Sequence, residues 1–312
     1  MTRAALLAMA LAATGCIESL DSKELVTGPR ILDMVADRPE VNPGQSVSLS
    51  VFLAGLSENA APTYRWQWCV ANTISRGATN VSDFGTNSSE SGCFGTDGGA
   101  AANLGTGPTA TLPVPANLLE ALEEAARRAA MGGQNLPVSP EVIAALARDI
   151  GLVLGFAVTV EVDGRVLRGY KRVVVSANRE NANTNPPAPR FRFDGRWVGR
   201  EAGSDRRCVA EDGRPLTAPR NASVALAPDG DETAWQQRYT ILNATGTLAT
   251  REERGFYAWY ASSGDLARQS TRSPTRDNAW RTGAAAGPQT LWVFLRDGHG
   301  GTSACETPVT VE

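Results

Sequence analysis

"VLGFAVTVEVDGRVLRGYKRVVVSA", residues 153–177, contains two runs of apolar and β-branched residues on either side of Asp163-Gly164. This dipeptide favours the tight two-residue turn of a β-hairpin. The stretch therefore predicts a long hairpin. Because further short strand patterns separated by Gly, Pro and Asn occur on both sides of it, we predict an all-β sandwich.

Other strands are predicted from apolar residues that recur at every second position. This period is shown by Val47, Leu49, Val51 and Leu53. Residues 63–71, "TYRWQWCVA", and residues 108–114, "PTATLPV", are the next two predicted strands. Beyond residue 189, six more segments carry strand patterns: residues 189–195, 221–228, 238–242, 255–262, 289–301 and 306–312.

Two helices are expected between the fourth strand and the final hairpin of the first half, as an insertion at about residues 115–151. In residues 116–133 the apolar side chains at helical spacing are Leu118, Leu119, Leu122, Ala125 and Ala129. Residues 139–151 begin with Ser139 as N-cap and Pro140 at the first helical position. We expect both helices to pack on the sandwich.

A domain boundary is predicted at residues 178–189, "NRENANTNPPAP", which has no apolar period. The halves on either side resemble each other. Each has a tryptophan in a predicted middle strand, Trp66 or Trp259, followed by an Asp-Gly turn, Asp163-Gly164 or Asp297-Gly298. We therefore expect two tandem Ig-like domains, residues 30–177 and 190–312, with Trp66 and Trp259 in their cores.

The N-terminus predicts export. Residues 4–13 form an apolar run of signal-peptide length, too short to span a bilayer. Ala13-Thr14-Gly15-Cys16 resembles the bacterial lipobox, in which the cysteine is lipidated. We predict a lipoprotein signal peptide at residues 1–15, a lipid on Cys16 and a flexible tether at residues 16–29. Since Ile17 rather than aspartate follows the cysteine, we expect the outer membrane.

The cysteine count agrees with export. Of five cysteines, lipidation would use Cys16 and leave four. Three pairings are possible. We favour Cys69–Cys93 and Cys208–Cys305, because each bond then remains inside one predicted domain. Free buried thiols are the alternative.

Little in the chain suggests catalysis. The one histidine, His299, lies in a glycine-rich turn without an evident orienting scaffold, and no hydrolase, zinc or nucleotide motif occurs. A net charge of −3 gives no signature of nucleic-acid binding. We predict no enzyme activity and no cofactor.

Two kinds of ligand site were weighed. Asp229, Asp231 and Glu232 are close enough together for a calcium site, with a solvated turn as the alternative. Among the seven tryptophans, those in polar surroundings could form an exposed binding face, with core or edge packing as the alternative. These are Trp197, Trp235 and Trp280.

Residues 38–51, 169–189 and 294–311, together with the lipobox, resemble the Ig-like or PKD-like lipoproteins of myxobacteria. The shared motifs are strand ends and turns. The resemblance implies tandem β-sandwiches on an outer-membrane lipid anchor, and it transfers no enzyme activity.

We therefore expect a lipid-anchored envelope protein that acts as a binding or scaffold module, its partner an envelope protein or a glycan. One alternative is a glycan- or peptidoglycan-binding lipoprotein that uses exposed tryptophans. The other is a carboxylate-based hydrolase with Asp229 and Asp231 at its cleft.

Overall fold

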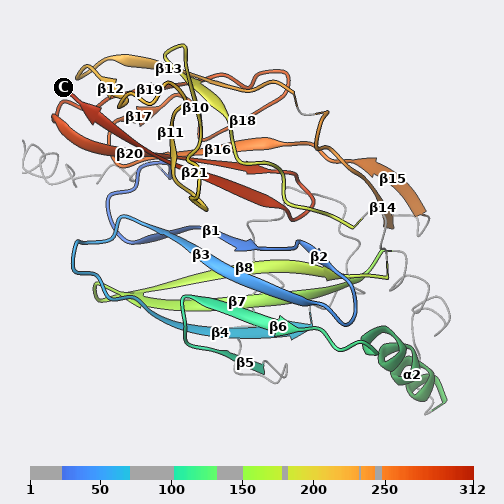
Figure 1. Cartoon of the computed structure of the whole chain (residues 1–312). Coiled ribbons are helices and arrows are strands. Elements are labelled where there is room, and N and C mark those ends of the chain that lie inside the picture. The colour runs from blue at the N-terminus through green and yellow to red at the C-terminus, as the bar shows by residue number, and fades with distance from the viewer. Residues whose placement is uncertain (1–22, 71–101, 132–149, 178–181, 232, 243–247) are drawn as a thin grey trace, which may run out of the picture.

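The structure, a computed structural model, describes residues 23–70, 102–131, 150–177, 182–231, 233–242 and 248–312 (Figure 1). The regular secondary structure of these residues is almost entirely β-strand, which confirms the predicted all-β class. Within these ranges, none of the helical structure is both long and apolar enough to cross a membrane. We call residues 30–175 the N-terminal region and residues 191–311 the C-terminal region.

Two sheets form the N-terminal region. The three-stranded sheet has the order β1-β3-β6, with β1 (Arg30–Ala36), β3 (Ser46–Ala54) and β6 (Thr109–Pro113). The five-stranded sheet has the order β2-β8-β7-β4-β5, with β2 (Glu40–Val41), β8 (Arg165–Val175), β7 (Leu152–Val162), β4 (Thr63–Val70) and β5 (Ala102–Gly105).

The hairpin predicted from residues 153–177 is confirmed as β7 and β8. Its turn residues Asp163 and Gly164 have φ values of 48° and 70°. Positive φ at both central residues is what a two-residue turn matching the strand twist requires.

The C-terminal region also contains two main sheets. The six-stranded sheet has the order β11-β10-β9-β13-β19-β17, with β11 (Cys208–Ala210), β10 (Arg196–Arg200), β9 (Phe191–Phe193), β13 (Ser223–Pro228), β19 (Asn278–Arg281) and β17 (Asp265–Leu266). The five-stranded sheet has the order β12-β21-β20-β16-β18, with β12 (Thr217–Ala218), β21 (Thr302–Val311), β20 (Gly287–Arg296), β16 (Phe256–Ala261) and β18 (Ser270–Arg272). A separate hairpin pairs β14 (Arg238–Leu242) with β15 (Leu248–Glu252).

The five-stranded sheets of the two regions share one strand order, whereas the second sheet has three strands in the N-terminal region and six in the C-terminal region. In each five-stranded sheet a short strand lies parallel to the last strand of the region, β2 on β8 and β12 on β21. The last two strands form a hairpin, and a tryptophan-bearing strand pairs with its first strand, β4 with β7 and β16 with β20. This arrangement is Ig-like, with two sheets that enclose alternate inward-facing residues.

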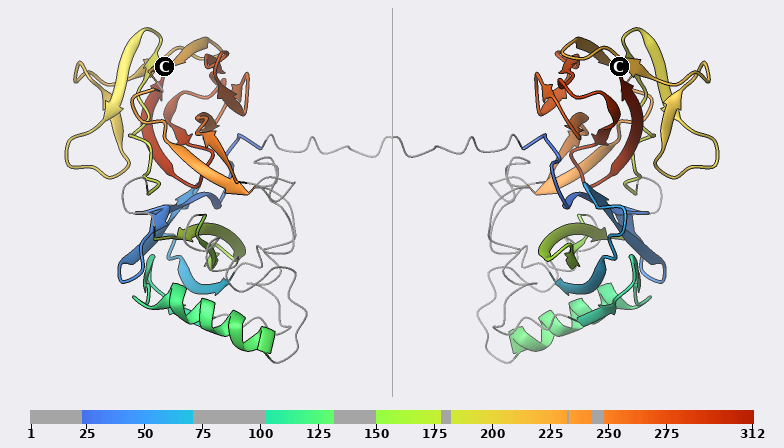
Figure 2. Two further views of the ribbon diagram at one scale, coloured as in Figure 1. Left: turned by 90° about the vertical axis from the view of Figure 1, so that its right-hand side faces the viewer. Right: turned by 90° about the vertical axis from the view of Figure 1, so that its left-hand side faces the viewer.

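Each pair of sheets encloses its own hydrophobic core. Trp66 is fully buried in the N-terminal core and Trp259 in the C-terminal core, as predicted. The helix α2 (Leu118–Met131) lies between β6 and β7 in the chain, at the end of the N-terminal region remote from the C-terminal region (Figure 2). Leu118, at its first turn, packs against the N-terminal core. The predicted helix at residues 139–151 lies almost entirely outside the described residues.

The expected tether is shorter than predicted. Leu25 forms a parallel bridge with Ala261 at the end of β16, and Val26 N–H donates to the Ala261 carbonyl at 2.9 Å. Val26 is buried. The chain is therefore fixed to the C-terminal region before β1 begins, and the prediction of a flexible tether to residue 29 is wrong for residues 24–26.

Candidate functional site at the junction of the two regions

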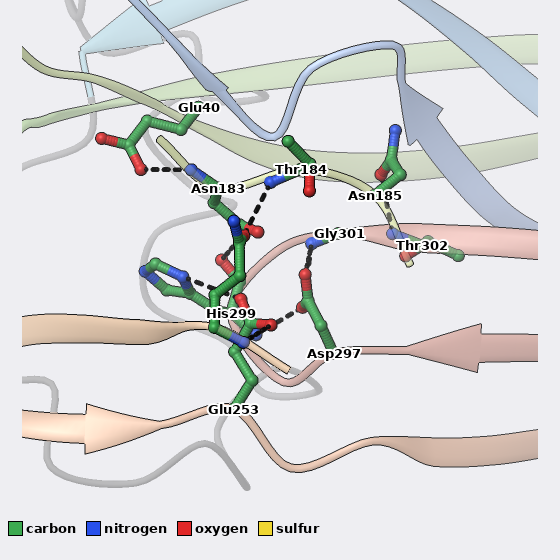
Figure 3. A network of polar contacts seen from close by, with 10 residues as sticks. Glu40, Asn183, Thr184, Asn185, Glu253, Asp297, His299, Gly301 and Thr302 are labelled. Carbon is green, nitrogen blue, oxygen red and sulfur yellow. Dashed lines mark hydrogen bonds and ion pairs between the residues drawn. The ribbon is translucent and has the colours of Figure 1, made fainter. Parts of the chain in front are cut away.

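The segment predicted to be a linker is held between the two regions by hydrogen bonds. Asn183 is buried, and its backbone N–H donates to Glu40 Oε2 at 2.8 Å. Its side-chain Nδ2 donates to the His299 carbonyl at 3.1 Å. Asn183 therefore connects β2 of the N-terminal region to the turn after β20 in the C-terminal region (Figure 3).

Two neighbours of Asn183 extend this connection. Thr184 N–H donates to Gln237 Oε1 at 3.1 Å, close to the start of β14. Asn185 Nδ2 donates to the Ala36 carbonyl at 2.7 Å, and Asn185 Oδ1 accepts from Thr302 N–H at 2.9 Å. The linker thus bonds to both regions through backbone and side-chain groups whose partners are more than 50 positions away in the chain.

The turn at residues 297–301 is built around a buried carboxylate. Asp297 is fully buried and accepts backbone N–H groups from His299 at 2.6 Å and from Gly301 at 2.9 Å. A Cβ atom at residue 301 would overlap the Asp297 carboxylate, so glycine is required there. This is the physical reason for the glycine-rich sequence.

His299 is oriented by its surroundings. Its ring stacks on Tyr239 of β14, with ring centroids 3.7 Å apart and an interplanar angle of 13°. Nδ1 lies 3.4 Å from Glu253 Oε1, and Glu253 Oε2 accepts from Gln237 N–H at 3.0 Å. The expectation that no scaffold orients this histidine is wrong, because the residues that orient it lie far away in the chain.

Glu253 and His299 leave two buried polar atoms without a short hydrogen bond. Glu253 Oε1 and His299 Nδ1 are both buried and have no hydrogen-bond partner among the described residues. Their separation of 3.4 Å exceeds the usual N–H···O range. Each is nevertheless the partner available to the other, so the position of one proton decides whether they attract.

Burial governs the charges in this cluster. It raises the pKa of Asp297 to about 6, and the nearby Glu253 acts in the same direction, while the hydrogen bond from His299 N–H opposes the shift. Burial also lowers the pKa of Lys171 on β8, whose Nζ donates to Thr302 Oγ1 at 3.3 Å. We call Glu40, Asn183, Glu253, Asp297 and His299 the junction cluster.

An apolar contact and an ion pair continue the junction on the other side of β1. Phe52 of β3 meets Phe294 of β20 edge to face, with ring centroids 5.0 Å apart. Arg296 Nε lies 3.0 Å from Asp33 Oδ2, and this guanidinium also lies over the Phe294 ring. The buried residues of this contact are Val26, Leu32, Phe52, Ala54, Ala258, Trp292, Phe294 and Ala304.

The predicted tryptophan face is not assembled. Trp280 is fully buried and its Nε1 donates to the Ser263 carbonyl at 2.8 Å, so its candidate binding role is wrong and the alternative of core packing holds for it. Trp235 packs against the C-terminal core beside Gly255. Trp197 lies under two guanidinium groups, those of Arg190 and Arg192, 4.0 and 4.5 Å from its ring centroid.

Two of the three candidate calcium ligands, Asp229 and Asp231, interact with other side chains of the protein. Asp229 Oδ2 lies 2.9 Å from Arg190 Nη1, and Asp231 Oδ1 accepts from Thr233 Oγ1 at 2.7 Å. Glu232 lies outside the described residues. Across the described ranges, no group of three or more His, Cys, Asp or Glu residues is arranged to hold a metal ion.

One predicted disulfide is confirmed. Cys208 of β11 and Cys305 of β21 are bonded, with Cα atoms 5.4 Å apart. The bond joins the two sheets of the C-terminal region. The pairing of Cys69 with Cys93 and the lipidation of Cys16 lie outside the described residues.

Comparison with known proteins gives only distant likenesses. No family model and no curated protein matches the chain. Solved structures that align with it include a mutant alpha-2-macroglobulin of Salmonella (11% identity, 93% of this chain, 16% of that chain, TM-score 0.25). Another is a red sea bream transglutaminase (7% identity, 91% of this chain, 32% of that chain, TM-score 0.23). A third is the D0-D1 domain of intimin (9% identity, 89% of this chain, 98% of that chain, TM-score 0.20). The chain spans about a sixth of the macroglobulin's length. At these TM-scores the likenesses carry no conclusion about function.

Proposed function

We propose that this chain is a lipid-anchored envelope protein that acts as a binding or scaffold module, with two tandem Ig-like domains held at a fixed angle. The observation that carries the proposal is the junction. Linker hydrogen bonds, the Asp33–Arg296 ion pair and the Phe52–Phe294 contact join the two regions in three different ways. Domains within one chain move relative to each other unless their interface is extensive and apolar, so these contacts favour a rigid spacer.

The proposed anchor is a lipid on Cys16, and its support is the lipobox-like sequence before that cysteine. The chain joins the fold at Leu25, beside the junction. Lys23 is seven positions after Cys16, and an extended chain spans at most about 25 Å over that length. In this proposal the protein sits close to the outer membrane, with the junction near the surface.

A non-enzymatic role agrees with how the polar groups are used. The Asp297 carboxylate accepts hydrogen bonds from backbone N–H groups, and Asp229 forms an ion pair with Arg190. The alternatives lose residues on which they depended: the glycan-binding hypothesis loses Trp280, and the hydrolase hypothesis loses a free Asp229.

The anchor is tested with Cys16→Ala in the native host, by membrane fractionation and by mass spectrometry of the mature N-terminus. We expect the parent protein in the outer membrane with acyl chains on Cys16, and the variant in the soluble fraction or unprocessed. Ser19→Ala is the matched control and should remain membrane-bound. A Cys16→Ala protein held in the membrane as firmly as the parent would refute the anchor.

The fixed angle is tested separately by small-angle X-ray scattering of the full-length Cys16→Ala protein. We expect one arrangement of the two regions to account for the scattering curve. Arg296→Met, which removes the ion pair with Asp33, should broaden the distribution of arrangements. A parent protein that already requires a wide ensemble would contradict the rigid-spacer role and leave the anchoring result untouched.

A further inference from the structure

Three segments meet at the junction cluster: the β14–β15 hairpin, the turn at residues 297–301 and the linker at residues 182–187. Glu253 directly follows the last strand of the hairpin, His299 lies in the turn, and Asn183 of the linker donates to the His299 carbonyl (Figure 3). A change in the charge of His299 or of its neighbours therefore acts on all three segments at once.

We propose that Glu253, His299 and Asp297 form a proton-dependent latch, which holds the hairpin and the linker more tightly to the turn when it gains a proton. This goes beyond the proposed scaffold role, because it makes the strength of the junction depend on the acidity of the surroundings.

The geometry provides both the proton's place and its route. Glu253 Oε1 and His299 Nδ1 face each other at 3.4 Å, and the Glu253 side chain is 1% exposed. The imidazole is 21% exposed, so water can reach part of the ring. In the doubly protonated ring both nitrogens carry a hydrogen, so Nδ1–H then points at the Glu253 carboxylate. The contact then becomes a buried charge-assisted hydrogen bond, a strong type of contact.

Asp297 is the second place for a proton. Its carboxylate is fully buried beside Glu253, and two buried carboxylates repel each other. Protonation of Asp297 removes that repulsion. With the proton on Oδ2, Oδ1 still accepts the N–H groups of residues 299 and 301.

The charged groups that face the cluster come from several elements. Glu40 lies on β2, and Lys171 on β8. Arg296 of β20 is already paired with Asp33 of β1. Arg251 of β15 lies near Tyr239. Lys171 is a cation that interacts with Asp297, and among the described residues it has no carboxylate at bonding distance. The cluster therefore holds more carboxylates (Glu40, Glu253 and Asp297) than cations that neutralise them.

The direction of the pH dependence follows from Asp297. Its pKa in the folded protein, about 6, is higher than its ordinary value of 3.8. The folded junction therefore binds this proton more tightly than the open one. The resulting stabilisation is complete below about pH 4 and is lost as the pH rises through 6. Lys171 acts in the opposite direction, because burial lowers its pKa and so favours the fold at higher pH.

The test is amide hydrogen exchange of the full-length lipoprotein in detergent micelles between pH 5 and pH 7.5, corrected for intrinsic exchange rates. We expect the amides of Thr184, His299 and Gly301 to be about tenfold more protected at pH 5 than at pH 7.5, from the two Asp297 values above. Val293, in the middle of β20, provides a reference amide in the same region.

Asp297→Asn should reduce this tenfold change to less than twofold. Because that variant could fail to fold, Glu253→Gln and His299→Gln are measured as well, and each should weaken the pH dependence. Asp265→Asn, an exposed carboxylate on β17, is the matched control and should keep the full change. Protection in the parent that is constant or lower at pH 5 would overturn the latch, and so would a full tenfold change in both Gln variants. Neither result would affect the separate scattering test of the fixed angle between the two regions.

Discussion

The five-stranded sheets of the N-terminal and C-terminal regions have the same strand order, but the segments inserted between their strands differ. In the N-terminal region the insertion follows β6 and contains α2, which projects away from the junction (Figure 2). In the C-terminal region the β14–β15 hairpin follows β13 and supplies Tyr239 and Glu253 to the junction, and a disulfide joins the two sheets. The strands common to both regions form the sandwich. The position of an inserted segment decides whether it takes part in the contact between the regions.

The buried tryptophans show the same contrast at the level of one side chain. Trp66 Nε1 donates to the carbonyl of Gly107, an exposed residue of the β5–β6 turn, at 2.9 Å. Trp259 Nε1 donates to the buried hydroxyl of Thr271 on β18, also at 2.9 Å. Each core satisfies the indole N–H, but only the C-terminal core does so with a group that water cannot reach.

The largest expected effect comes from removing the Cys208–Cys305 bond by a double substitution to alanine. The cysteines are 97 positions apart, and closure of a loop of that length is worth about 4–5 kcal/mol in the chain-entropy model. Urea denaturation of parent and variant, followed by total tryptophan fluorescence, should show the variant unfolding at a lower urea concentration, because five of the seven tryptophans lie in the C-terminal region.

The control for this substitution is the parent protein under reducing conditions, which should behave like the variant. Peptide mapping without reduction supplies the N-terminal half of the comparison, where we predict a Cys69–Cys93 bond. A peptide that links Cys69 or Cys93 to Cys208 or Cys305 would contradict both that pairing and the independence of the two regions.

A smaller effect is expected from the matched pair Trp66→Phe and Trp259→Phe. Both substitutions remove the same volume, so the difference between them reports the lost hydrogen bond. Trp259→Phe strands a buried hydroxyl and should cost about 1–3 kcal/mol more than Trp66→Phe, whose former acceptor can bond to water. Chemical denaturation of each variant measures this difference, and equal costs would show that Thr271 finds another partner.

The smallest effect is expected on α2. Glu124 pairs with Arg128 at 2.8 Å on an exposed helix face, a type of pair worth about 0.3–0.5 kcal/mol. Glu124→Gln should speed amide exchange within α2 slightly and leave both sandwiches unchanged. Slower folding or faster exchange in β7 would mean that the helix supports the N-terminal core more than its position indicates.

Local sequence patterns were sufficient for the strands and their cores. Asp163-Gly164 predicted the β7–β8 turn because positive φ at both positions is a local requirement. Trp66 and Trp259 were placed correctly because alternation shows which side of a strand faces inward. The Cys208–Cys305 pairing followed from keeping each bond within one half of the chain.

The junction could not be predicted in this way. Asn183 and Asn185 belong to an Asn/Pro-rich stretch whose composition is the same whether it is free or bonded on both sides, and their partners lie far off in the chain. Trp280 was misjudged because its polar neighbours suggested exposure. One of them, Asn278, is itself buried and bonds to the backbone of Arg268.

The bridge between Leu25 and Ala261 also has a consequence for the order of assembly during synthesis. The two residues are 236 positions apart, so Leu25 cannot form this bridge until most of the protein has been made. At roughly 5–20 residues per second, that wait is on the order of ten to fifty seconds. If Cys16 is processed during export, the enzymes that act on it would meet a chain in which residues 24–26 are not yet bonded to β16. Completion of β16 would then draw that segment onto the finished fold.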